Sequence, residues 1–83
     1  MTANADTFTV AVAGAVRAEL SRCQRTISET AVAIGVSRGH LSKLLNGGGA
    51  FDTTQLAAIA DFLGIPVERI FDSAALSVEA VAS

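Results

Sequence analysis

Basic and small polar residues recur along the stretch 38–46 at a spacing that would bring them to one side of a helix. At about 100° per residue, they fall within an arc of about 140°. The residues of this arc are Arg38, Gly39, Ser42, Lys43 and Asn46. Arginine and lysine donate hydrogen bonds to O6 and N7 of guanine, and serine can bond to bases of either kind. These residue types at this spacing therefore favour contact with the edges of base pairs.

Side chains that enzymes use as nucleophiles or metal ligands are scarce. The chain has one cysteine, Cys23, and one histidine, His40, and neither has partners at ligand spacing. One cysteine cannot form an internal disulfide, and we interpret Cys23 as a small buried hydrophobic residue. No acid has a base partner that would indicate proton transfer. We therefore expect no enzyme, no metal site and no cofactor, and no small-molecule ligand is evident.

The polar arc needs a helix whose other side is anchored. Three leucines lie on a separate arc of about 100°, which could pack on the rest of the domain. They are Leu41, Leu44 and Leu45. Ser37 is a strong N-cap, and Asn46-Gly47 is a typical helix end. The sequence thus predicts a two-sided helix over about 38–46.

A second short helix is predicted just before it, over about 27–34. Thr26 and Glu29 have the spacing of a capping box. Gly35 can end the helix in the left-handed conformation, and Val36 is interpreted as the buried residue of the turn. The two helices would therefore be joined by a tight turn.

The pattern GVSRGHLSKLLNG, with Ala31 as the small residue of the preceding helix, resembles the Cro and lambda-repressor-like helix-turn-helix family. The resemblance continues through QLAAIADFLGIPVERIF and covers about 16–71. It implies an all-α fold, a compact five-helix DNA-binding domain. It also implies a sequence-specific DNA-binding transcriptional regulator, a repressor or Cro-like protein of phage or bacterial type. Such a protein would occupy a double-stranded DNA operator as a homodimer.

The resemblance also assigns roles to individual residues. Base contacts are expected from Arg38, Gly39, Ser42 and Lys43. Contacts with the DNA backbone are expected from Arg22, Arg25, Thr26, Ser37, His40, Asn46 and Gly47. The chain departs from the family at Ile27, where a phosphate-contacting glutamine is usual, and at Thr30, where a large apolar residue is usual.

Charge is divided unequally along the chain, although the net charge is −2. Residues 17–46 contain five basic and two acidic residues, whereas the rest contains one basic and six acidic residues. This division is consistent with a basic face turned to phosphate and an acidic face turned away. With 51% hydrophobic and 17% charged residues, the chain is not a disordered or acidic linker.

The remaining elements are predicted from apolar spacing and caps. An apolar stripe favours a helix over about 8–24, although the alternating segment TFTVAV could instead form a strand. Asp52 and Gln55 predict a capping box for a fourth helix that ends at Gly64, and Pro66 predicts the start of a short fifth helix.

We divide the chain into a flexible tail over 1–7, a helix-turn-helix domain over 8–72 and a C-terminal segment over 73–83. Asp72-Ser73 could cap an extra short helix in that last segment. Its apolar residues are Leu76, Val78 and Val81. They either fold back on the domain or pair with a second chain, and we favour dimerisation.

The apolar run 8–16 lacks a preceding positive region and is too short to span a bilayer. We therefore expect a cytoplasmic protein without membrane association.

An alternative function is a protein–protein interaction module that keeps the helix-turn-helix fold but has lost DNA binding. The acidic net charge, Ile27 and the uncharged loop 47–49 motivate this alternative.

Overall fold

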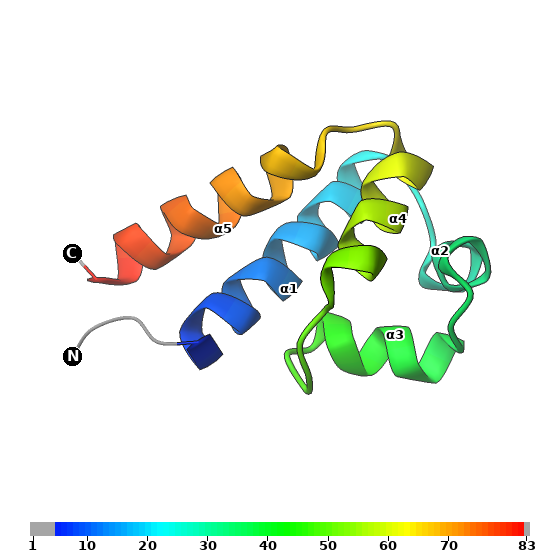
Figure 1. Ribbon diagram of the computed structural model, residues 1–83, viewed down its shortest axis with the longest axis horizontal. Helices are drawn as coiled ribbons and strands as arrows, with labels where there is room; N and C mark the ends of the chain where they lie inside the picture. Colours follow the sequence, from blue (N-terminus) through cyan, green and yellow to red (C-terminus); the bar gives the residue numbers. More distant parts are fainter. Residues whose placement is uncertain (1–4, 83) are drawn as a thin grey trace.

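The computed structural model describes residues 5–82, and in that range the chain forms five helices and no strand (Figure 1). Side chains are described for residues 7–79. The helices are α1 (Ala5–Arg22), α2 (Ile27–Ile34), α3 (Arg38–Leu45), α4 (Thr53–Leu63) and α5 (Val67–Ala82). The predicted all-α, five-helix fold is therefore confirmed. None of the helices within 5–82 is both long enough and apolar enough to cross a membrane.

Helix α1 starts earlier and ends earlier than the sequence suggested. Residues 5–7, expected in a flexible tail, are helical, and residues 1–4 of that tail lie outside the described residues. The strand alternative for TFTVAV is wrong, because 7–12 lie inside α1. An isolated strand would leave backbone groups unpaired, whereas the helical stripe buries Val12, Val16 and Leu20 in the core.

The turn that follows α1 contains a residue with a strained backbone conformation. Gln24 has φ 56°, in the left-handed region that glycine normally occupies. The amide of Gln24 donates to the carbonyl of Ser21 at 3.1 Å, and the amide of Arg25 donates to that of Leu20 at 2.9 Å. This bond pair is the Schellman arrangement, so the turn is satisfied although its residue is not glycine.

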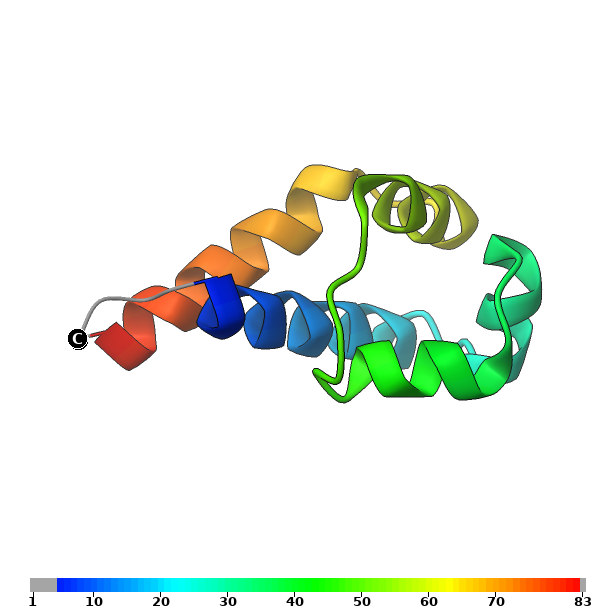
Figure 2. The same cartoon turned by 60° about the horizontal axis from the view of Figure 1, so that its bottom comes forward.

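Helix α5 is a single continuous helix that lies alongside α1 (Figures 1 and 2). The separate short helix considered after Asp72-Ser73 does not form. Ile70 and Ala74 are fully buried on either side of that dipeptide, so continuing the helix keeps both against the core. The rings of Phe8 and Phe71 stack, with 6.5 Å between their centroids.

The two departures from the family pattern are accommodated in the core. Thr30 is fully buried, and its hydroxyl donates to the carbonyl of Thr26 at 2.8 Å. A satisfied hydroxyl avoids the penalty of an unpaired buried polar group. Ile27 is half-buried and packs against the core cluster. Its side chain therefore contributes to packing, where the family has a polar residue.

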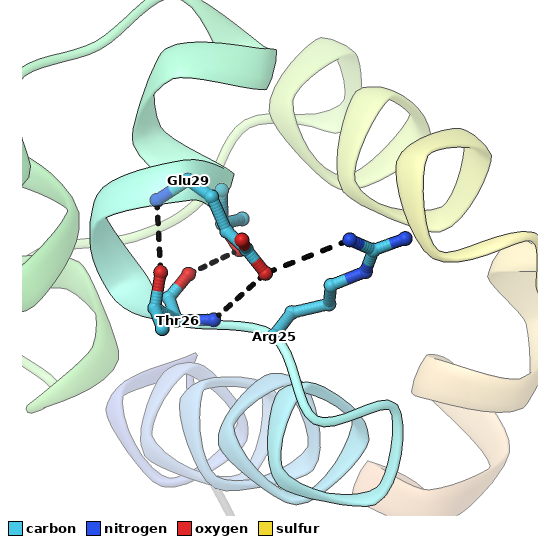
Figure 3. Close-up of polar contacts among 4 residues, drawn as sticks. Arg25, Thr26 and Glu29 are labelled. Carbon is cyan, nitrogen blue, oxygen red and sulfur yellow. Dashed lines mark hydrogen bonds and ion pairs between the residues drawn. The ribbon is translucent and has the colours of Figure 1, made fainter.

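The predicted caps of α2 and α4 are confirmed. In α2, the Thr26 hydroxyl oxygen accepts from the Glu29 amide and Glu29 Oε1 accepts from the Thr26 amide, both at 3.1 Å (Figure 3). Asp52 and Gln55 form the equivalent box at α4. Gly35 ends α2 with φ 76°, as its type predicted. The N-caps fix where α2 and α4 start, and Gly35 fixes where the turn into α3 begins.

Candidate nucleic-acid interface

Helix α3 lies at the edge of the molecule (Figures 1 and 2), and its three leucines are buried. Leu41, Leu44 and Leu45 are at most 4% exposed. On its other side the chain exposes Arg38, Gly39, His40, Lys43 and Asn46, with Ser42 half-buried. The two-sided helix predicted from the sequence is confirmed, and its apolar face fixes which side chains meet solvent.

Three residues expected at the DNA backbone also cap helices. The Ser37 hydroxyl oxygen accepts from the His40 amide at 3.0 Å, and Asn46 Nδ2 donates to the Ser42 carbonyl at 2.9 Å. Thr26 caps α2 in the same manner as Ser37. A hydroxyl that accepts one bond keeps its own O–H donor. Ser37 and Thr26 can therefore hold their helices and still donate to a phosphate.

The glycines after α3 pack closely, so this segment is more than a spacer. Gly47 has φ 78°, and its amide donates to the Leu44 carbonyl at 3.1 Å. A Cβ on Gly48 would lie 2.8 Å from Lys43 Cγ. The loop therefore runs against the aliphatic part of Lys43, whose side chain is exposed.

The arginines at the end of α1 are engaged within the chain. Arg22 Nη2 forms an ion pair and hydrogen bond with Glu19 Oε1, and Arg69 Nη1 of α5 lies 3.9 Å from the same oxygen. Glu19 is only 7% exposed, which the sequence did not indicate. A buried carboxylate needs such partners, so Arg22 has a structural role beside any contact with phosphate.

Arg25 bridges the start of α2 and the end of α4. Its Nη1 lies 3.6 Å from Glu29 Oε1, the oxygen that also accepts from the Thr26 amide (Figure 3). Its guanidinium lies over the ring of Phe62. The side chain is still 46% exposed, so the interaction fixes Arg25 without covering it.

Ser28 is a residue of this surface that sequence reasoning missed. Arg38 Nε donates to Ser28 Oγ at 3.1 Å, which joins the first residue of α3 to the first turn of α2. No pattern signals this contact, because the two residues are ten positions apart and the turn between them sets their relative position.

The acidic residues of α5 lie away from α3. In both ribbon views α1 separates α3 from α5 (Figures 1 and 2). Glu68, Asp72 and Glu79 are exposed on α5. The two cations of α3 therefore lie on one side of α1, and these three acids of α5 lie on the other.

The described residues contain no candidate metal site. No group of three or more His, Cys, Asp or Glu residues gathers within that range. Cys23 is a free, half-buried thiol rather than a fully buried one. His40 is exposed on α3, and its amide is held by the Ser37 cap.

Comparison with known proteins agrees with this geometry. A helix-turn-helix family model of the Cro/C1 type matches residues 19–70, which is more than half of the chain. A crystal structure of the clp gene regulator ClgR from C. glutamicum is 31% identical, with a TM-score of 0.80, covering 84% of this chain and 91% of that chain. A second structure of ClgR from Corynebacterium glutamicum is also 31% identical, with a TM-score of 0.86, covering 90% and 80%. The search of curated proteins gave no match. The chain therefore belongs to the Cro/C1-type helix-turn-helix family and is a DNA-binding transcriptional regulator, not an enzyme.

Proposed function

We propose that this regulator is a sequence-specific repressor or Cro-like protein of bacterial or phage type that occupies its operator as a homodimer. The observation that carries the proposal is α3 itself, whose leucines are buried while its basic and polar residues are exposed. A recognition helix requires this combination, because one side must be anchored while the other meets base edges in the major groove.

Base readout is assigned to the exposed residues of α3. Arg38 and Lys43 are five positions apart, which is about 7.5 Å along the helix, or roughly two base-pair steps. Both side chain types can donate to guanine O6 and N7. Ser42 and Gly39 lie between them, and a Cβ on Gly39 would meet nothing within 4 Å. Packing within the chain therefore does not require glycine at 39, and we assign its small size to close approach of the DNA.

Phosphate contacts are assigned to the residues around the motif, and they would position the protein without reading sequence. Arg25 is the most favourable of these, because it is held in place and remains exposed. The others proposed are Arg22, Thr26, Ser37, His40, Asn46 and Gly47.

A homodimer is proposed because one α3 spans too few base pairs to specify an operator alone. The face formed by α1 and α5 is the candidate interface. Val10 is 57% exposed and Leu76 is 66% exposed, and Val78 lines a hollow of about 300 Å³ between the two helices. Helix α5 thus packs on its own domain and still presents apolar surface. The side chain of Val81, the third residue expected at the interface, lies outside the described residues.

Repression by occupancy requires a DNA-binding surface and a dimer interface. We assign the first to α3 and the residues around it, and the second to the face formed by α1 and α5. A cytoplasmic location goes with this proposal, because bacterial DNA lies there. The similar structures are of the clp gene regulator ClgR, so DNA upstream of clp genes is the first probe to use.

The direct test is selection of bound duplexes from a random DNA library with the purified protein, followed by binding isotherms on the selected and scrambled duplexes. We expect one enriched motif with two half-sites about one helical turn apart. Enrichment of a single half-site would contradict the homodimer but not DNA recognition. No enrichment at low salt would contradict DNA recognition and favour the protein–protein module instead.

A further inference from the structure

The hydrogen bond between Ser28 and Arg38 links the two helices of the motif on the surface assigned to DNA. Arg38 Nε donates to Ser28 Oγ at 3.1 Å, and both residues are exposed. Arg38 is the first residue of α3, where a long side chain would otherwise sample many rotamers. The contact therefore restricts the direction of an exposed side chain. Such a restriction favours contact with another molecule in a fixed geometry.

The geometry of the guanidinium determines which of its donors remain for DNA once Nε–H is bonded to Ser28. Arginine has five N–H donors in a planar fork, of which one is on Nε and four are on the two terminal nitrogens. With the Nε–H directed to Ser28, the terminal pair remains to donate in parallel to two acceptors. Guanine O6 and N7 form such an acceptor pair in the major groove.

The surroundings of Arg38 differ from those of the chain's paired arginines. Arg22, Arg25 and Arg69 each lie within ion-pair distance of a glutamate. Arg38 makes no ion pair with any carboxylate in the described part of the chain, and its fixed contact is with a neutral hydroxyl. Its direction is thus restrained while its positive charge stays uncompensated.

The neighbours of Ser28 on α2 cannot supply this contact. Ile27 has no polar side-chain atom and packs against the core cluster. Glu29 Oε1 already accepts from the Thr26 amide and pairs with Arg25. Among residues 27–29, Ser28 is therefore the one whose side chain can accept the hydrogen bond from Arg38.

We propose that Ser28 is a positioning residue that sets Arg38 for end-on, bidentate recognition of one guanine. The proposal rests on the proposed function of α3 and adds a specificity determinant outside it. Ser28 acts through Arg38, so removing its hydroxyl weakens discrimination at the base pair that Arg38 reads rather than binding in general.

The test is a double-mutant cycle of Ser28→Ala and Arg38→Ala, with Ser28→Thr as the variant that keeps the hydroxyl. Binding isotherms are measured on the duplex selected by the wild type, on duplexes with each G·C pair of the half-site replaced, and on a scrambled duplex. Thermal unfolding of each variant checks the fold. Ser28 is exposed, and alanine is a good helix former, so Ser28→Ala should fold normally.

We expect Ser28→Ala to lower the preference for one G·C pair by about three- to tenfold, the range of a typical hydrogen bond. Ser28→Thr should retain the preference. In the Arg38→Ala background, Ser28→Ala should change affinity by less than about twofold, because the group it positions is gone.

Two outcomes separate this inference from the function on which it rests. If the wild type selects a motif but Ser28→Ala weakens all duplexes equally, with or without Arg38, then Ser28 is only a backbone contact and the inference is wrong. If the wild type distinguishes no duplex from the scrambled control, the proposed function and this inference both fail.

Discussion

The guanidinium of Arg25 lies over the ring of Phe62, with 5.0 Å between the guanidinium carbon and the ring centroid. The same guanidinium pairs with Glu29, which caps α2 (Figure 3). One exposed cation thus joins the start of α2 to the end of α4. Because α2 carries the turn into α3, this contact helps to fix the orientation of α3, the helix to which we assign base recognition.

Replacing Arg25 with alanine should affect both stability and DNA binding. Loss of the cation–π contact should lower the free energy of unfolding by about 0.5–1 kcal/mol. Loss of one phosphate contact should weaken cognate and scrambled duplexes about equally and reduce the salt slope by ~1. Urea unfolding and salt-dependent isotherms measure the two effects. Arg25→Lys is the control, since it keeps the charge and the salt slope. An unchanged slope in Arg25→Ala would contradict the phosphate contact.

The Arg38→Ala variant should lose DNA binding in a different way from Arg25→Ala. We expect a cost of ~1–3 kcal/mol on the cognate duplex and relaxed specificity at one or two positions, because a base contact discriminates as well as binds. Competition between the cognate duplex and its single-base-pair variants measures this loss. Equal losses on cognate and scrambled duplexes would mean that α3 does not read bases through Arg38.

The strained end of α1 offers a stabilising substitution. Gln24 has φ 56°, which glycine adopts without steric cost, so Gln24→Gly should raise the free energy of unfolding by about 0.5–1 kcal/mol. Gly35→Ala is the matched opposite: Gly35 has φ 76° and open space around its Cα, so its replacement should cost about 1 kcal/mol through backbone strain alone. Urea unfolding compares both with the wild type. A less stable Gln24→Gly variant would show that the glutamine side chain contributes more than its backbone strain costs.

The proposed dimer face can be tested at a single exposed position. Leu76→Glu should raise the dimer dissociation constant at least tenfold, because a charge would be buried at an apolar interface. Val32→Glu is the control, since Val32 is an apolar residue of α2 that is 82% exposed and outside the α1–α5 face. Sedimentation at several concentrations gives the assembly state. If Leu76→Glu sediments as the wild type does, the interface lies elsewhere.

Local signals in the sequence determined most of the helix boundaries. The Thr26–Glu29 and Asp52–Gln55 capping boxes and the left-handed Gly35 depend on residues only a few positions apart, so they could be predicted. The two-sided character of α3 followed in the same manner from the 3.6-residue period. The extra helix expected after 72 did not form because tertiary packing, rather than local capping, decided that α5 continues. Continuous pairing of α1 with α5 buries Ile70 and Ala74.

Only the tertiary structure decided which polar residues pair between separate helices. Glu19 reads as an ordinary helix-surface acid, yet folding brings Arg69 from α5 beside it in a nearly closed environment. Ser28 gave no signal until the turn between α2 and α3 placed it against Arg38. The physical reason is that caps and helical periodicity act between near neighbours along the chain, whereas these contacts depend on the angles at which separate helices pack. The sequence by itself therefore determined the family and the outward face of α3. The packed structure decided which basic side chains of the protein are fixed by other residues, and which residues fix them.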